Sequence, residues 1–475
     1  MRKILMMAVL AFLSLQGVGA RASGISLLES GKKKLVAQED TVKKDTVKKV
    51  TAYEKLLKDG GSECEGMFTV RHIKDNWYFE VPDTLLGRLL LAVTRFKAVP
   101  QGFKMLSGEE VNRSVVYWEQ HDDKTLFLRE YVQSQFARPG DNIAEALKQS
   151  TVDPVIYKFD VIGRNPETQA QLIDVSKLFL GDNKLCGFTS SDRSILGIGT
   201  LAQDRTFMDT IKTYPINVEA VTLRTYSISA GRLPAAQTGS VTVKLNTSIV
   251  MLPKEPMQPR FADDRVGFFQ NSLTEFSDDQ QTTDRGAIIQ RYRLEPKDPE
   301  RYRRGQLSEP KNPIIYYIDP ATPKKWIPYL KAGVEDWNTA FEAAGFKNAL
   351  QVQNGQPEVT VAYHQIVYSY AMGKSQFSQI SDSRTGEIFS GNIVLSHKES
   401  EDNLPGIQLS IGGYEPAVLT DSMPIVREEY IRYQASKLTG QLLGLQPNWA
   451  GSAAFTTKQL RDAAWARENG ISASV

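Results

Sequence analysis

Apolar positions recur most regularly in the last third of the chain, residues 314–475. The run IIYYI, residues 314–318, is continuously apolar, which is typical of a strand buried on both faces. Residues 321–346 repeat apolar side chains about every 3.6 positions. This spacing predicts a helix whose buried face consists of Leu330, Val334, Trp337, Phe341 and Ala344.

Two further apolar runs, residues 359–372 and 386–397, predict strands. A last helix is predicted over residues 424–445, with a buried face made of Ile431, Ala435, Leu438, Leu442 and Leu445. A sheet covered by two helices is the smallest arrangement that buries these faces. We therefore predict a mixed sheet with two helices over residues 314–475.

The region before residue 314 has a different pattern. Residues 51–97 predict a small α+β unit, with a helix over 53–60, a β-hairpin over 67–81 and a helix over 82–96 that begins with proline. Residues 98–290 predict a mainly antiparallel β domain, because β-type runs alternate with turn residues at 114–120, 125–136, 155–163, 220–228 and 240–252. A helical stretch, 141–149, interrupts them. The polar, proline-rich residues 291–313 predict a linker, and the fold class is α+β.

The N-terminus has the features of a secretory signal peptide over residues 1–22. Arg2 and Lys3 precede an apolar run, and small residues follow at 18–20. An uncleaved membrane anchor is the alternative, although the run is shorter than the ~20 residues that a span needs. Residues 23–50 contain the repeat DTVKKDTVKK and predict a disordered tether. The mature chain is expected to be periplasmic or secreted, without a membrane span.

Composition narrows the range of partners. Lys and Arg total 57 against 55 Asp and Glu, and this balance excludes the basic footprint of a nucleic-acid-binding protein. Two cysteines, Cys64 and Cys186, either form a disulfide or remain free thiols. The oligomeric state leaves no signal in the sequence.

Motifs for catalysis or metal binding are missing from the sequence, which contains no HExxH, no GxSxG and no phosphate-binding glycine loop. The four histidines are His72, His121, His364 and His397. His364 and His397 fall in two predicted strands of one sheet and, with a carboxylate such as Asp382 or Glu387, would make a metal site. Ordinary surface or hydrogen-bonded histidines are the alternative, because nothing in the sequence fixes their geometry.

Several stretches nevertheless resemble the large secreted zinc-dependent metalloproteases of Gram-negative bacteria, whose catalytic unit is metzincin-like. The resemblance runs from about Tyr53 to the last residue. Its most specific parts are the Tyr-Ile-Asp-Pro-Ala-Thr-Pro and Glu-Asp-Trp stretches within residues 312–349, together with residues 204–222, 257–269 and 386–397.

In that family the active helix carries HExxHxxGxxH, in which three histidines bind zinc and the glutamate polarises water. With Gly444 as the turning glycine, the corresponding stretch here is KLTGQLLGLQP, residues 437–447. The histidine positions then carry Lys437, Gln441 and Pro447, and the glutamate position carries Leu438. An ammonium group, an amide and a proline are poor zinc ligands, and a leucine cannot act as a base. The resemblance therefore implies a degenerate member without zinc, without another cofactor and without peptidase activity.

The C-terminus is a second departure. RENGISASV, residues 467–475, is similar to the run that leads into a methionine-containing turn beneath the metal in that family, and the chain stops there. We therefore expect a C-terminally truncated member.

The resemblance also suggests where a ligand would bind. In metzincin-like enzymes an edge strand above the cleft pairs with extended substrate, and residues 388–396 are the matching segment. The candidate peptide-binding residues are Ile388, Phe389, Asn392, Ile393 and Val394. Binding of a peptide or protein needs only the unpaired backbone of the strand. The alternatives are an active zinc metallopeptidase with non-standard ligands, and a truncated product without a retained role.

Overall fold

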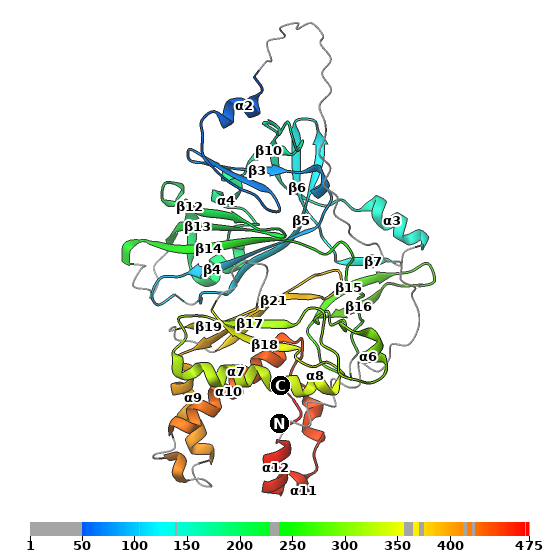
Figure 1. The fold of residues 1–475 in the computed structure, drawn as a ribbon, viewed down its shortest axis with the longest axis vertical. Coiled ribbons are helices and arrows are strands. Elements are labelled where there is room, and N and C mark those ends of the chain that lie inside the picture. The colour runs from blue at the N-terminus through cyan, green and yellow to red at the C-terminus, as the bar shows by residue number, and fades with distance from the viewer. Residues whose placement is uncertain are drawn as a thin grey trace, which may run out of the picture.

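The structure is a computed structural model that describes residues 50–103, 105–137, 140–228, 237–263, 265–355, 364–369, 375–411, 416–419, 423–470 and 472–474. The predicted signal peptide and nearly all of the predicted tether lie outside these ranges. Helices and mainly antiparallel sheets are combined, which confirms the α+β class (Figure 1). None of the described helices is both long and apolar enough to cross a membrane.

The N-terminal sheet confirms the predicted hairpin, which is formed by β2 (Thr69–Ile73) and β3 (Asn76–Val81). Helix α2 (Ala52–Leu57) is also confirmed, and it begins with a capping box between Thr51 and Glu54. The sheet has the order β1 (Ser62–Cys64), β2, β3, β10 (Gln171–Asp174) and β9 (Gly163–Arg164), so its last two strands come from later in the chain than the predicted unit.

The helix predicted over residues 82–96 is wrong. A short 3-10 turn, η1 (Asp83–Leu85), is followed by strand β4 (Leu90–Ala98), which lies between β14 (Ser240–Met251) and β5 (Glu110–Asp122) in an eight-stranded sheet. A mostly apolar run that includes the β-branched Val93 and Thr94 suits a strand buried on both faces as well as a helix, and the neighbouring strands decide between them. The other strands of this sheet are β5 (Glu110–Asp122), β6 (Thr125–Glu130), β8 (Val155–Asp160), β11 (Ile198–Leu201), β12 (Phe207–Thr213), β13 (Asn217–Ile228) and β14 (Ser240–Met251).

The antiparallel character predicted for the middle of the chain is confirmed, since every pairing in the eight-stranded sheet is antiparallel. A smaller sheet is formed by β7 (Gln135–Ala137), β15 (Gln270–Phe276) and β16 (Asp284–Ile289). The helices of this region are α3 (Asn142–Ser150), which was predicted, and α4 (Ser176–Leu180) and α5 (Ser190–Leu196), with the 3-10 turn η2 (Gln203–Arg205). Cys64 is exposed and Cys186 is buried, and both are free thiols.

The C-terminal sheet is mixed, as predicted, with the strand order β18 (Leu350–Asn354), β17 (Ile314–Ile318), β19 (His364–Ser369), β21 (Ile388–Ser396) and β20 (Gln376–Ser381). Only β20 runs antiparallel to its neighbour. The strands β18 and β20 were not predicted from the sequence. Figure 1 shows this sheet between the eight-stranded sheet and helices α7 (Ile327–Glu335) and α10 (Met423–Leu442).

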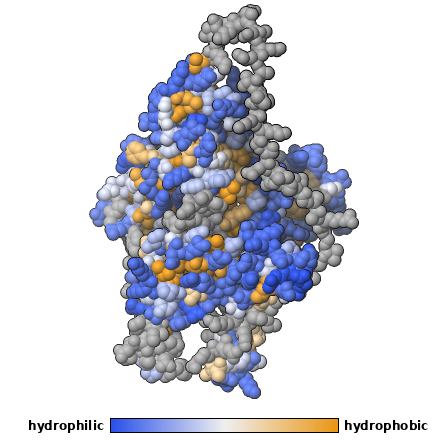
Figure 2. All heavy atoms as spheres, viewed as in Figure 1, coloured by the Kyte–Doolittle hydropathy of each residue, from blue (hydrophilic) through white to orange (hydrophobic). Residues whose placement is uncertain are grey.

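The two predicted helices of this domain are confirmed together with their buried faces. All ten residues assigned to those faces are less than 9% exposed. The first helix is interrupted, so that η4 (Lys324–Trp326), α7 and α8 (Asn338–Ala343) follow one another. Five more helical segments among the described residues were not predicted: α9 (Glu399–Ile411), η5 (Pro416–Leu419), η6 (Trp449–Ala453), α11 (Thr457–Arg461) and α12 (Ala463–Asn469). Figure 2 shows a mostly hydrophilic face with apolar residues gathered in a band at the level of the C-terminal sheet.

Residues 291–313, predicted as a linker, are folded against the C-terminal domain. They contain helix α6 (Pro299–Arg303), and Pro296 pairs with Pro310 in an isolated bridge. The Tyr302 hydroxyl donates to the Ala344 carbonyl at 3.2 Å, and its ring lies 5.1 Å from that of Phe346.

Helix α10 is held against α7 by a small set of specific contacts. A Cβ on Gly333 would collide with the Arg432 carbonyl oxygen, so the helices can approach this closely only because α7 has a glycine there. The Arg432 guanidinium binds Asp336 through two hydrogen bonds, at 2.8 and 3.0 Å. The Trp337 indole donates to the Ser436 carbonyl at 2.8 Å. The Glu-Asp-Trp stretch therefore determines the position of α10.

The chain leaves α10 through a turn at Gly444, whose φ is +101°. The Phe269 amide donates to the Gly444 carbonyl at 2.7 Å, and the Gln446 amide donates to the Gly267 carbonyl at 3.0 Å. Residues 257–269 are one of the stretches that carry the resemblance. Their backbone thus pairs with the segment that follows α10.

The C-terminal sheet contacts the eight-stranded sheet through buried and polar groups. Ile380 packs in one cluster with Leu91, Val93 and Val115. Glu109, which precedes β5, accepts a hydrogen bond from the Gln376 side chain of β20. Burial raises the pKa of the Glu109 carboxyl to about 7, although this bond and one from the backbone of Leu106 act in the opposite direction.

We predict that Gly444→Ala lowers the free energy of unfolding by about 1–3 kcal/mol. The positive φ is unfavourable for alanine, and the added Cβ would collide with the Gln290 carbonyl oxygen. Chemical denaturation measures the loss. Gly355→Ala is the matched control, because its φ is +100° but nothing lies within 4 Å of the new Cβ. Equal losses in the two variants would contradict a packing role for Gly444.

The second prediction concerns pH. Because the folded-state pKa of Glu109 is raised above its ordinary value of 4.5, the folded chain holds a proton that the unfolded chain releases between pH 4.5 and about 7. Stability from this group is therefore present at low pH and is lost as the pH rises through that window, by about 1–2 kcal/mol after a discount for solvent screening. Glu109→Gln should flatten this part of the pH profile of the unfolding free energy. An unchanged profile would refute the assignment.

Candidate functional site

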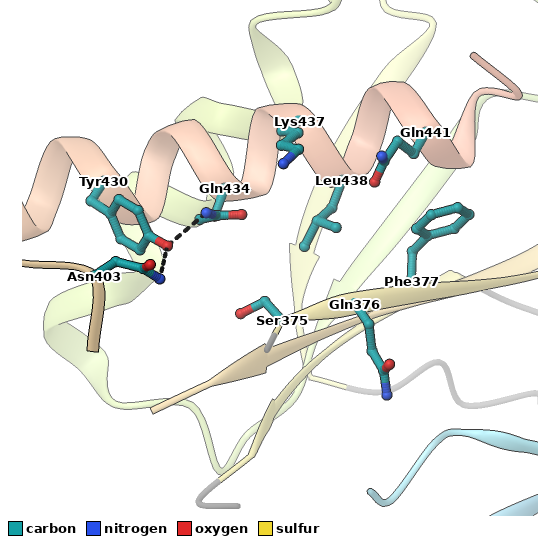
Figure 3. A pocket seen from close by; sticks show the side chains of 9 residues that line it. All are labelled: Ser375, Gln376, Phe377, Asn403, Tyr430, Gln434, Lys437, Leu438 and Gln441. Atoms are coloured by element: carbon teal, nitrogen blue, oxygen red, sulfur yellow. Dashed lines mark hydrogen bonds between the residues drawn. The ribbon is translucent and has the colours of Figure 1, made fainter. Parts of the chain in front are cut away.

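A pocket of about 450 Å³ lies between α10 and β20, at the positions where the zinc motif would fall. Lys437 and Gln441 are one turn apart on α10 and therefore lie on the same side of the helix. Both line the pocket, together with Leu438. Figure 3 shows the Leu438 side chain extending from α10 toward the sheet, and Leu438 is only 4% exposed.

The opposite wall is formed by the edge strand β20 and the residue before it. Ser375, Gln376 and Phe377 line the pocket there. Gln376 extends away from α10 in Figure 3, in agreement with its hydrogen bond to Glu109. The pocket thus connects the helix face to the edge of the C-terminal sheet.

A polar group closes one end of the pocket. The Tyr430 hydroxyl accepts a hydrogen bond from the Asn403 amide of α9 at 2.8 Å and another from the Gln434 amide at 2.7 Å (Figure 3). Tyr430 and Gln434 precede Lys437 by seven and three positions, so helical periodicity could have found them in the sequence. Ser375 and Asn403 come from other elements, and no pattern in the sequence connects them to the helix.

The remaining motif positions lie outside the pocket. Pro447 is exposed and is not among the lining residues. Gly444 is buried and ends the helical region, as the turning glycine was expected to do. The structure therefore brings together Lys437, Leu438 and Gln441, but not Pro447.

The expectation that residues 388–396 form the edge strand is wrong. They form β21, which pairs with β19 on one side and β20 on the other. The Ile388 amide donates to the Arg291 carbonyl at 2.9 Å, and the Asn392 side-chain amide donates to Gly108 at 3.2 Å. Phe389, Ile393 and Val394 pack in apolar clusters. Along the chain β20 lies between β19 and β21, but in the sheet it is the outermost strand, next to β21. The sequence pattern did not predict this strand.

The outer edge of β20 is partly covered by the middle domain. The Arg113 guanidinium donates to the Gln379 carbonyl at 2.5 Å, so the middle domain occupies the strand at that point. The beginning of the strand, around Gln376 and Phe377, borders the pocket instead.

The alternative metal site is also contradicted by the geometry. Gln365 pairs with Asn392 and Ser369 pairs with Ser396, so His364 and His397 lie at opposite ends of the β19–β21 pair. A separation of about six strand positions is roughly 20 Å, too far for one metal ion. Asp382 is fully buried and is bound by Arg384. Among the residues described, no three His, Cys, Asp or Glu side chains are grouped to hold a metal ion.

The other two histidines stack on aromatic rings. His72 lies 4.2 Å from the Trp77 ring and His121 lies 4.5 Å from the Phe127 ring, measured between centroids. Neither belongs to the C-terminal sheet, because His72 lies in β2 and His121 in β5.

Comparison with known proteins finds three family models that match parts of the chain. Residues 50–99 match a domain of unknown function (DUF5118), and residues 108–297 match a second domain of unknown function (DUF5117). Residues 421–475, which include α10 and the whole of KLTGQLLGLQP, match a model described as Met-zincin. No curated protein and no solved structure matches. The region that forms the helical wall of the pocket is therefore metzincin-like.

Proposed function

We propose that the protein is a secreted, catalytically inactive relative of the metzincin-like zinc proteases that binds an extended peptide between α10 and β20. One observation carries this proposal: Lys437, Leu438 and Gln441 line the same pocket as the edge strand. The helix face that would hold the metal and the strand that would hold the substrate thus remain together, while the side chains needed for hydrolysis are replaced. The predicted signal peptide would direct this binding activity to the periplasm or the exterior.

The donor set of the pocket does not fit zinc. The ion prefers imidazole nitrogen, thiolate or carboxylate ligands, and the lining residues offer none of these. The Lys437 ammonium would repel a dication, and the buried Leu438 side chain can neither polarise water nor accept a proton. A water molecule in this pocket would keep the high pKa of bulk water, whereas a zinc-bound water has a pKa of about 7.

Peptide binding needs less from the site than hydrolysis does. An edge strand offers unpaired backbone N–H and C=O groups, and an added strand satisfies them without any metal. The beginning of β20 borders the pocket, so a side chain of a paired peptide could enter it. The proposed binding site is thus β20, and not the β21 residues expected from the sequence.

The purified mature chain, dialysed against metal-free buffer, should retain far less than one zinc ion per chain and cleave no unstructured protein. Metal analysis by mass spectrometry and a casein digestion assay measure the two quantities. Stoichiometric zinc that survives dialysis would refute the proposal.

The double variant Lys437→His/Gln441→His is the matched control for zinc. It places two imidazoles one turn apart on the same helix face, a spacing that suits a shared metal ion. It should retain more zinc than the unaltered chain, and this increase would show that the assay detects binding at the pocket.

Backbone pairing makes a separate prediction. Peptides selected from a random heptapeptide display on the mature chain should lose at least about ten-fold in affinity when alternate amides are N-methylated, because each methyl removes a donor to β20. Methylation of the intervening amides, which point away from the strand, should have little effect. Calorimetry measures both series, and a loss that does not alternate would argue against pairing with an edge strand.

A further inference from the structure

The side chains that line the pocket between α10 and β20 carry a net positive charge. Its nine lining residues include one cationic side chain, Lys437, and no Asp or Glu. The remaining lining residues are polar and neutral, except Phe377 and Leu438. Any charged group that enters the pocket therefore meets one positive charge and a set of neutral dipoles.

Lys437 has no acidic partner among the described residues. It takes part in none of the ion pairs found there, and the residues one turn before and after it on α10 are Tyr433 and Gln441. Its side chain is partly buried, and in Figure 3 its amino group extends from α10 on the side that faces β20. A partly desolvated ammonium without a counter-ion is an electrostatic binding site for an anion.

The neighbouring side chains suit a carboxylate in particular. Gln441 makes no side-chain hydrogen bond in the described structure, so its amide is available to donate beside the ammonium. Phe377 and Leu438 provide an apolar wall that can contact the carbon atoms of an acidic side chain. Charge-assisted hydrogen bonds from an ammonium to a carboxylate are among the stronger polar contacts in proteins.

We propose that this pocket binds a peptide carboxylate, held by Lys437 and Gln441, so that the protein selects acidic extended peptides. This inference rests on the proposed function, because it names the substrate class of the same site. The carboxylate comes either from an Asp or Glu side chain or from the C-terminus of the peptide, and both have the same chemistry.

The test uses labelled pentapeptides built on Thr-Val-Thr-Val-Thr, with Glu or Gln placed at each position in turn. Each peptide is made with a free and with an amidated C-terminus, and fluorescence anisotropy gives its affinity for the full mature chain. At one position Glu should bind about ten-fold or more tightly than Gln if a side chain enters the pocket. If the terminal carboxylate enters instead, the free C-terminus should bind more tightly than the amide by the same factor.

Three variants test whether the preference for a carboxylate arises in the pocket. Lys437→Gln should abolish the preference, Lys437→Arg should retain it, and Lys212→Gln, which removes an exposed charge on β12, should leave it unchanged. Peptides that bind with equal affinity whatever their charge would overturn the inference but leave the proposed function standing.

A second measurement separates the pocket from the strand. The melting temperature of the full chain is measured in glutarate and in its neutral analogue glutaramide, with sodium chloride added to equal ionic strength. Glutarate should raise it in the unaltered chain and not in Lys437→Gln. If no peptide binds but this shift is present, the proposed function fails and the carboxylate pocket stands. If neither is observed, both fail.

Discussion

The close contact of α10 with α7 is the constraint on which the candidate site depends. The absence of a side chain at Gly333 lets the two helices approach, while Asp336 and Trp337 bind Arg432 and the Ser436 carbonyl. Since a helix carries its side chains at fixed angles, fixing α10 at two adjacent turns also fixes which residues face β20. Lys437 follows Ser436 directly, so the contact between α7 and α10 also fixes the position of Lys437 in the pocket.

The same packing separates the residues that orient α10 from those that line the pocket. The contacts that orient α10 are made by residues other than Lys437 and Gln441, so these two positions can change without loss of the scaffold. Leu438 lines the pocket as well, but it also packs in the apolar cluster of the C-terminal domain and so contributes to the scaffold.

Contacts between the domains restrict the proposed binding surface on β20. β20 is paired with β21 on one side, and Arg113 of the eight-stranded sheet binds its Gln379 carbonyl. The beginning of the strand, at Gln376 and Phe377, lines the pocket beside α10. The middle domain therefore limits how far a peptide bound in the proposed way could extend along the edge, and Glu109, whose pKa is raised by burial, takes part in the contact between the two domains.

Local periodicity in the sequence determined the α+β class, the buried faces of the two C-terminal helices and the hairpin over residues 67–81, because burial repeats every 3.6 or 2 positions in such elements. The sequence also specifies which side chains stand at residues 437–447, the stretch on which the expectation of an inactive site was based. Only the tertiary structure decided that residues 90–98 form a strand, that β20 and not β21 is the edge, that His364 and His397 are far apart, and that Ser375 and Asn403 join the pocket. Strand order and contacts between distant elements arise from long-range packing, which leaves no periodic signal in the chain.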